Sequence, residues 1–121
     1  MASAGAAGTD TMNDQDGAWT YLCETAALVG YDGLRVEIAD HPPLAVFKVG
    51  ASYYVTDDTC THGAASLADG YLHGCEIECP FHSGRFDVRT GAATTFPCVD
   101  ALAVYPAEVR NNAVYARLKT P

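Results

Sequence analysis

Apolar and polar residues alternate with a period of two along several short stretches of this chain, as expected for strands with one buried face. Residues 34–38 read Leu-Arg-Val-Glu-Ile and are the clearest case. Residues 45–49 end at Gly50, and the aromatic and β-branched stretch 52–56 follows at the distance of a tight turn. These last two stretches therefore predict a hairpin.

Four more strands are predicted further along the chain, at residues 74–78, 85–88, 102–105 and 114–118. The last two are expected to form a hairpin around Asn111 and Asn112, because asparagine tolerates the left-handed conformation that such turns need. Helical periodicity is confined to residues 24–29, with one further helical turn expected within 64–69. Many short strands separated by turn residues predict an all-β fold, an antiparallel sandwich or barrel.

Length and charge narrow the classes of function. The chain has 121 residues, enough for one domain, which we expect at 17–121 after a flexible tail at 1–16. Fifteen acidic against seven basic residues give a formal net charge of −8, which disfavours nucleic acid as a partner. No apolar stretch reaches the roughly 18 residues of a membrane span. Five cysteines without a secretion signal predict a reducing compartment, the cytoplasm.

The candidate chemistry lies in two short motifs, Cys-Thr-His at residues 60–62 and Cys-Pro-Phe-His at residues 79–82. Each motif supplies one thiolate and one imidazole. Such a set can hold a [2Fe–2S] cluster, with Cys on one iron and His on the other. Zinc also accepts two Cys and two His, but zinc sites usually place like ligands together. The mixed pairs favour the cluster, with a structural zinc site as the alternative.

At these motifs the chain resembles the Rieske family, and in particular the small Rieske ferredoxins of bacterial aromatic-ring dioxygenase systems, over about residues 19–118. The resemblance implies that Cys60 and Cys79 bind the inner iron of one [2Fe–2S] cluster, and that His62 and His82 bind the outer iron. It also implies a Rieske-like antiparallel β-sandwich or barrel with a small cluster-binding subdomain at about residues 57–91.

Two departures from the respiratory members of this family bear on the potential of the cluster. Those members carry a disulfide between the loops at positions that are Ala65 and Phe81 here, and hydroxyl donors at positions that are Gly84 and Phe86 here. Hydrogen bonds to sulfur stabilise the reduced cluster and raise its potential. Without these donors we expect the lower part of the Rieske range of about −150 to +300 mV, with a midpoint below zero.

The resemblance implies an electron carrier rather than an enzyme. A reductase, expected to be flavin-dependent, would deliver single electrons, and a terminal oxygenase would receive them from a monomeric ferredoxin in aromatic hydrocarbon catabolism. The small Rieske-like subunit of an assimilatory nitrite reductase is the alternative function, and a zinc-stabilised interaction module is a further one. The chain has no His after residue 82, so no second 2-His-1-carboxylate iron site is expected downstream.

Several other residues are interpreted more simply. Cys23, Cys75 and Cys98 are predicted to be small buried hydrophobes. His73 lies between the two motifs in the sequence, but it is not expected to be a ligand. Four carboxylates beside the motifs are candidates for an acidic collar where a partner docks, the alternative being an ordinary solvated surface: Asp57, Asp58, Glu76 and Glu78.

Overall fold

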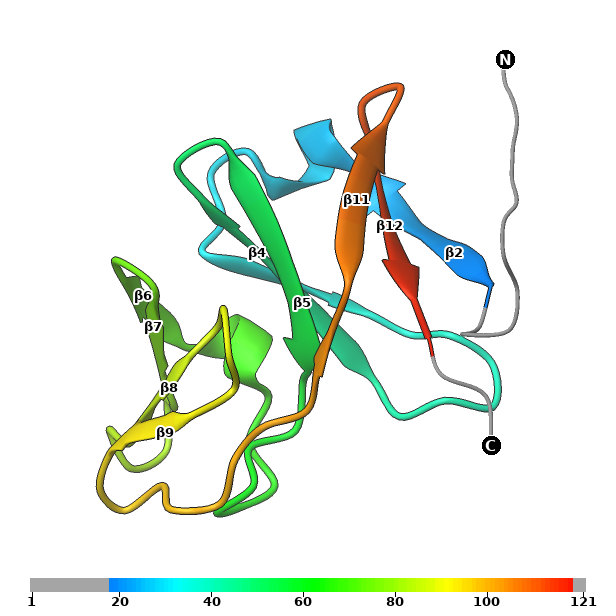
Figure 1. Cartoon of the computed structure of the whole chain (residues 1–121). Helices are drawn as coiled ribbons and strands as arrows, with labels where there is room; N and C mark the ends of the chain where they lie inside the picture. The colour runs from blue at the N-terminus through cyan, green and yellow to red at the C-terminus, as the bar shows by residue number, and fades with distance from the viewer. Residues whose placement is uncertain (1–17, 119–121) are drawn as a thin grey trace.

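The computed structural model describes residues 18–118, which fold into three antiparallel sheets. The first sheet has the order β10-β5-β4-β3 and the second β11-β12-β2. The third sheet, β6-β7-β8-β9, forms a separate lobe at the lower left of Figure 1. The all-β antiparallel fold expected from the sequence is confirmed. The predicted tail at 1–16 lies outside the described residues.

The alternating stretches 34–38, 45–49 and 52–56 all correspond to strands of the first sheet, although the strand at 34–38 already ends at Val36. The sheet contains β3 (Gly33–Val36), β4 (Leu44–Val49), β5 (Ser52–Asp57) and β10 (Val104–Tyr105). The predicted hairpin is β4–β5, and Gly50 takes a φ of 60° at its turn. That left-handed conformation is open to glycine without a steric penalty, so Gly50 suits the turn.

The second sheet corrects one predicted pairing. It contains β2 (Trp19–Glu24), β11 (Ala107–Arg110) and β12 (Ala113–Arg117). Asn111 and Asn112 form the predicted turn, with φ of 50° and 64°, but the strand before them is β11. The prediction that residues 102–105 pair with 114–118 is wrong, because β10 pairs with β5 in the first sheet. Residues 107–110 alternate over only four positions, and three of the four are exposed, so this strand lacks the longer half-buried pattern that predicts the others.

The third sheet carries the second Cys/His motif between two of its strands. It contains β6 (Tyr71–His73), β7 (Glu76–Glu78), β8 (Arg85–Asp87) and β9 (Ala93–Thr95). Residues 79–84 connect β7 to β8, which pair directly. The subdomain boundary at 57–91 stays a prediction; the sheet itself continues to Thr95.

Strand β4 lies between two hydrophobic cores, and its residues alternate between them. Leu44 and Val46 pack in a core with residues of β2, β5 and β12. Ala45 and Phe47 pack in a second core, which includes both motif cysteines and residues of the third sheet. All four side chains are fully buried, which explains why this strand reads as a continuous apolar run.

Helical structure within residues 18–118 is limited to two 3₁₀ turns, η2 (Thr25–Leu28) and η3 (Leu67–Asp69). Both fall inside the stretches where helical turns are predicted. No helix among the described residues is long and apolar enough to cross a membrane.

A buried carboxylate, Asp58, fixes the start of the first motif loop. Its side chain is fully buried and accepts hydrogen bonds from the Arg35 guanidinium at 3.2 Å and the Ala68 backbone N–H at 2.9 Å. Its own N–H donates to the carbonyl of Pro43, and its carbonyl accepts from the N–H of Leu67. Asp58 therefore joins β3, the segment before β4 and the turn η3.

We predict that Asp58→Ala lowers the free energy of unfolding by about 2–3 kcal/mol, because the part-buried Ala68 N–H and the Arg35 guanidinium then lose their acceptor. Chemical denaturation followed by circular dichroism measures the loss. Asp69→Ala is the control, because Asp69 is an exposed carboxylate in the same segment and should change stability little. Equal losses in the two variants would contradict the anchoring role of Asp58.

Candidate metal centre

The first motif loop, residues 58–66, folds back on its own cysteine. The backbone N–H of Cys60 donates to the carbonyl of Ala65 at 3.0 Å, and Thr59 forms an isolated β-bridge with Ser66. This closure leaves Cys60 only 3% exposed, while His62 at the middle of the loop is exposed. The loop therefore turns its thiol inward and its imidazole outward.

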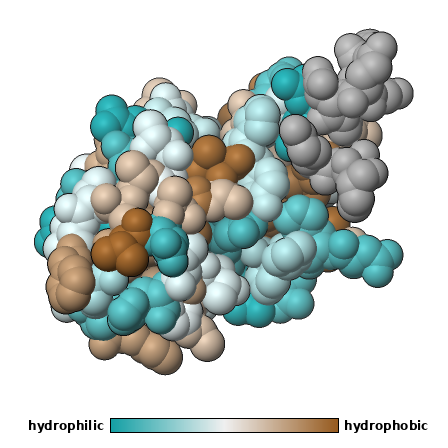
Figure 2. Space-filling view, turned by 60° about the horizontal axis from the view of Figure 1, so that its bottom comes forward, coloured by the Kyte–Doolittle hydropathy of each residue, from teal (hydrophilic) through white to brown (hydrophobic). Residues whose placement is uncertain are grey.

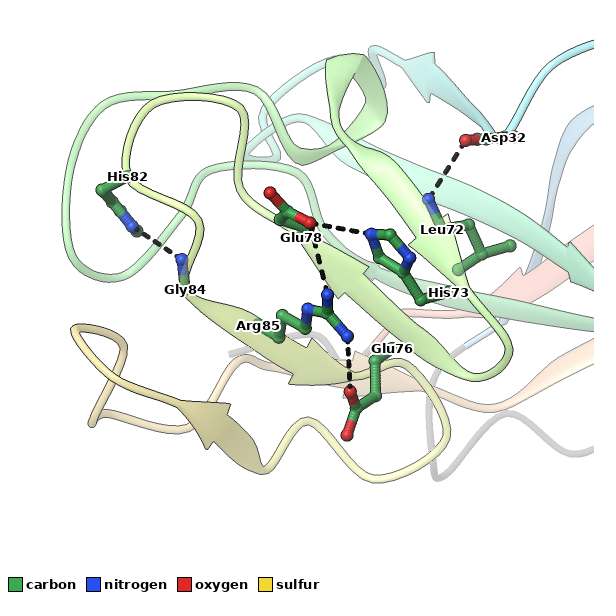
Figure 3. Close-up of polar contacts among 8 residues, drawn as sticks. All are labelled: Asp32, Leu72, His73, Glu76, Glu78, His82, Gly84 and Arg85. Atoms are coloured by element: carbon green, nitrogen blue, oxygen red, sulfur yellow. Dashed lines mark hydrogen bonds and ion pairs between the residues drawn. The ribbon is translucent and has the colours of Figure 1, made fainter.

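The second motif loop, residues 79–84, closes in the same way. The N–H of Cys79 donates to the carbonyl of Gly84 at 2.8 Å, and the N–H of Ser83 donates to the carbonyl of Cys79 at 3.2 Å. Ser83 has a φ of 65°, which reverses the chain within this short loop. Cys79 is 1% exposed, and the N–H of Gly84 donates to Nδ1 of His82 at 3.3 Å (Figure 3).

The two loops bring the four predicted ligand residues together. Nε2 of His82 lies 3.3 Å from Sγ of Cys60, and, besides burial, the neighbouring Cys60 thiol contributes to raising the pKa of the Cys79 thiol. The rings of His62 and His82 meet edge to face, with centroids 4.5 Å apart and an interplanar angle of 87°. The arrangement is two buried sulfurs on the inside and two imidazoles toward the surface.

Burial raises the pKa of the Cys79 thiol, and the backbone N–H groups of Phe81 and His82 oppose that rise. A thiol in this position keeps its proton more strongly than an exposed thiol does. Metal binding requires the thiolate and releases that proton. The two N–H groups are then placed to stabilise the negative sulfur.

A third loop, residues 96–103, completes the site, and sequence reasoning missed its part in it. Cys98 in this loop is buried, and its Sγ, Sγ of Cys60 and a ring nitrogen of His82 lie within 4.8 Å of one another. The Thr61 hydroxyl donates to the carbonyl of Asp100 at 2.8 Å and ties the first loop to the third. Cys98 is separated from the motifs in sequence, so only the fold brings it to the site.

Two other candidates lie away from the donor set. Nε2 of His73 lies 2.7 Å from Oε1 of Glu78, and it stays a prediction that His73 is not a ligand. Cys75 is only half-buried, so its assignment to the core is correct only in part. Its carbonyl accepts a hydrogen bond from the N–H of Val88 beside the third sheet.

The prediction of an acidic collar around the site is wrong. Arg85 lies between Glu76 and Glu78 (Figure 3), with nitrogen–oxygen distances of 3.4 and 3.5 Å. Asp57 accepts a hydrogen bond of 2.6 Å from the Tyr105 hydroxyl, and Asp58 is fully buried. Each of these four carboxylates therefore has a hydrogen-bond or ion-pair partner within the fold, and together they form no ring of unpaired negative charge.

The donor set fits a [2Fe–2S] cluster of mixed ligation. Two buried sulfurs and two adjacent imidazoles toward the surface provide Cys for one iron and His for the other. The mixed motifs also place each Cys with a His on the same loop, unlike the like-with-like spacing of zinc fingers.

Comparison with known proteins agrees with this geometry. Residues 18–106 match the family model of the Rieske [2Fe–2S] domain. The chain is 44% identical over 97 residues to ferredoxin CarAc of Metapseudomonas resinovorans, which covers 80% of this chain and 91% of that one. A solved complex of reduced oxygenase and oxidised ferredoxin in carbazole 1,9a-dioxygenase contains a chain with a TM-score of 0.78 and 41% identity, covering 89% of this chain and 99% of that one.

A nitrite reductase small subunit has a similar solved structure, with a TM-score of 0.70 over 84% of this chain and 99% of that one. Its identity is 20%, so the likeness shows a shared fold alone. The family match and the ferredoxin relatives show membership of a family as well as a fold, because they extend over most of the described residues and the relatives have higher identity. The chain therefore belongs to the Rieske [2Fe–2S] domain family.

Proposed function

We propose that this chain is the ferredoxin component of an aromatic-ring dioxygenase system and carries single electrons from a reductase to the terminal oxygenase. The support is its similarity to ferredoxins over most of their length, including CarAc and a ferredoxin solved in complex with its oxygenase. The reductase, expected to be flavin-dependent, is proposed with the same system.

The four motif residues are proposed to hold the cofactor, Cys60 and Cys79 on the buried side and His62 and His82 toward the surface. When bound, the [2Fe–2S] cluster takes up and releases one electron. The closed loops hold the sulfurs away from water, and the exposed imidazole of His62 lies where a partner can approach.

The surface beside these imidazoles is apolar, which suits transient docking. Phe81 is 75% exposed next to His82, and Phe96 and Val99 of the third loop are 82% and 68% exposed. Figure 2 shows apolar surface among hydrophilic side chains on the face that includes this end of the molecule. Exposed large apolar residues are typical of the centre of a protein interface.

We further propose that the chain transforms no organic substrate and acts as a monomer in the cytoplasm. None of the five cysteines, all of which lie within the described residues, forms a disulfide, which suits a reducing compartment. The alternative function, a small subunit of a nitrite reductase, is supported only by the shared fold. Stable copurification with a large flavin or haem subunit would favour it.

We predict that Cys60→Ser and Cys79→Ser each lose the cluster, because serine replaces a soft thiolate ligand. Iron and acid-labile sulfide analysis of the purified variants measures the loss, which should be nearly complete. His73→Ala and Cys75→Ser are the matched controls, because both residues lie outside the donor set and should leave the content at wild-type levels.

Loss of iron from either control variant would contradict the assigned ligand set. Zinc in wild-type protein, without iron and sulfide, would contradict the cluster itself and the electron-carrier function with it.

We predict a midpoint potential below zero for the wild-type protein. Phe86 is fully buried and apolar and Gly84 has no side chain, so neither provides a hydroxyl donor to the cluster. A redox titration followed by electron paramagnetic resonance should detect the reduced Rieske signal only at negative potential. A signal already present above zero would shift the function toward respiratory electron transfer.

A further inference from the structure

Cys98 is a buried thiol against the metal centre to which the proposed ligand set gives no role. It is 4% exposed, and its sulfur lies within 4.8 Å of Sγ of Cys60 and a ring nitrogen of His82. Bonds on both sides hold it there: its N–H donates to the carbonyl of Thr95 at 3.2 Å, and the Asp100 carbonyl accepts from Thr61. The thiol is therefore held at a defined position against the donor set.

The contact with Gly84 shows how closely the third loop approaches the second. A Cβ placed on Gly84 would lie 2.4 Å from Sγ of Cys98, 3.0 Å from its backbone N and 3.1 Å from the carbonyl oxygen of Thr95. Real Cβ atoms do not approach other atoms at the first of these distances. The Cys98 thiol therefore occupies the volume that a side chain at position 84 would need.

The Cys98 thiol has one proton that it can donate in a hydrogen bond, and the sulfur of Cys60, a proposed cluster ligand, is a nearby acceptor. Because the Cys98 thiol is buried away from water, its hydrogen-bond partner is expected among the groups of the site. Hydrogen bonds to the sulfurs of an iron–sulfur centre stabilise its reduced form, which carries the extra negative charge.

We propose that Cys98 is a positioning residue of the electron-transfer site, whose S–H donates toward the sulfur of Cys60 and raises the midpoint potential. It supplies from the third loop a donor that Gly84 cannot supply from the second. The proposal rests on the proposed function, since it requires Cys60 to be a cluster ligand.

The variants Cys98→Ala and Cys98→Ser separate the donor from the packing. Both remove the sulfur, and serine alone keeps a proton to donate at that position. We expect the midpoint potential of Cys98→Ala to shift to lower values, and that of Cys98→Ser to stay at or above the wild-type value. Redox titration followed by electron paramagnetic resonance measures both, with iron and sulfide content determined on the same samples.

Cys23→Ala is the matched control for this experiment. Cys23 is also a buried cysteine, but it packs in the other core with residues of β2, β5 and β12. Its removal should therefore leave the midpoint potential and the resonance signal unchanged. A potential shift equal to that of Cys98→Ala would show a general effect of core truncation and would overturn the proposal.

Three further results would overturn it: an unchanged potential in Cys98→Ala, the same shift in the alanine and serine variants, or loss of iron from both variants with the fold intact. The last result would make Cys98 a ligand. If neither variant folds, the infrared difference spectrum between oxidised and reduced wild-type protein decides. An S–H stretch that moves to lower frequency on reduction supports the proposal, and an S–H region unaffected by reduction overturns it.

Failure of the proposed function gives a different result. In that case wild-type protein contains no iron and sulfide, or its reduced cluster passes no electron to an oxygenase. A wild-type cluster that transfers electrons normally, with a potential insensitive to Cys98, would retain the carrier function and remove only the role of this thiol.

Discussion

The metal centre depends on one backbone constraint that appears twice. In each motif loop the N–H of the cysteine donates to the carbonyl of the residue five positions later, Ala65 in the first loop and Gly84 in the second. The closure keeps each sulfur inside the protein and leaves the remainder of the loop to carry its histidine outward. The asymmetry between the two proposed iron positions thus begins in backbone geometry, before any metal is bound.

Polar side chains next to the two loops hold them in place through hydrogen bonds and ion pairs within the fold. Asp58 holds the start of the first loop against β3 and η3 with both its backbone and its carboxylate. Arg85, next to the end of the second loop, is held between Glu76 and Glu78. Charges in this region therefore stabilise the loops internally, and large apolar side chains such as Phe81 and Phe96 remain exposed beside them.

The sequence predicted the strands and turns whose formation depends only on neighbouring residues. Alternation predicted β3, β4 and β5, and the Asn111–Asn112 turn was correct because its geometry depends on two adjacent residues. The partner of β12 was missed, because the choice between residues 102–105 and 107–110 depends on which sheet offers a free edge. The position of Cys98 was missed for a related reason. A third loop approaches the site only after two sheets have formed, and no spacing in the chain encodes that distance.

Strand β4 has a consequence for how this fold tolerates change. Its successive side chains serve two cores in turn, Leu44 and Val46 on one side and Ala45 and Phe47 on the other. Inserting or deleting a single residue here would exchange the two sets, presenting large groups where small ones fit in both cores at once. Length variation among relatives should therefore accumulate in the connections between strands. The length of β4 itself should stay constant, because it sets the position of the core that includes the motif cysteines relative to the other core.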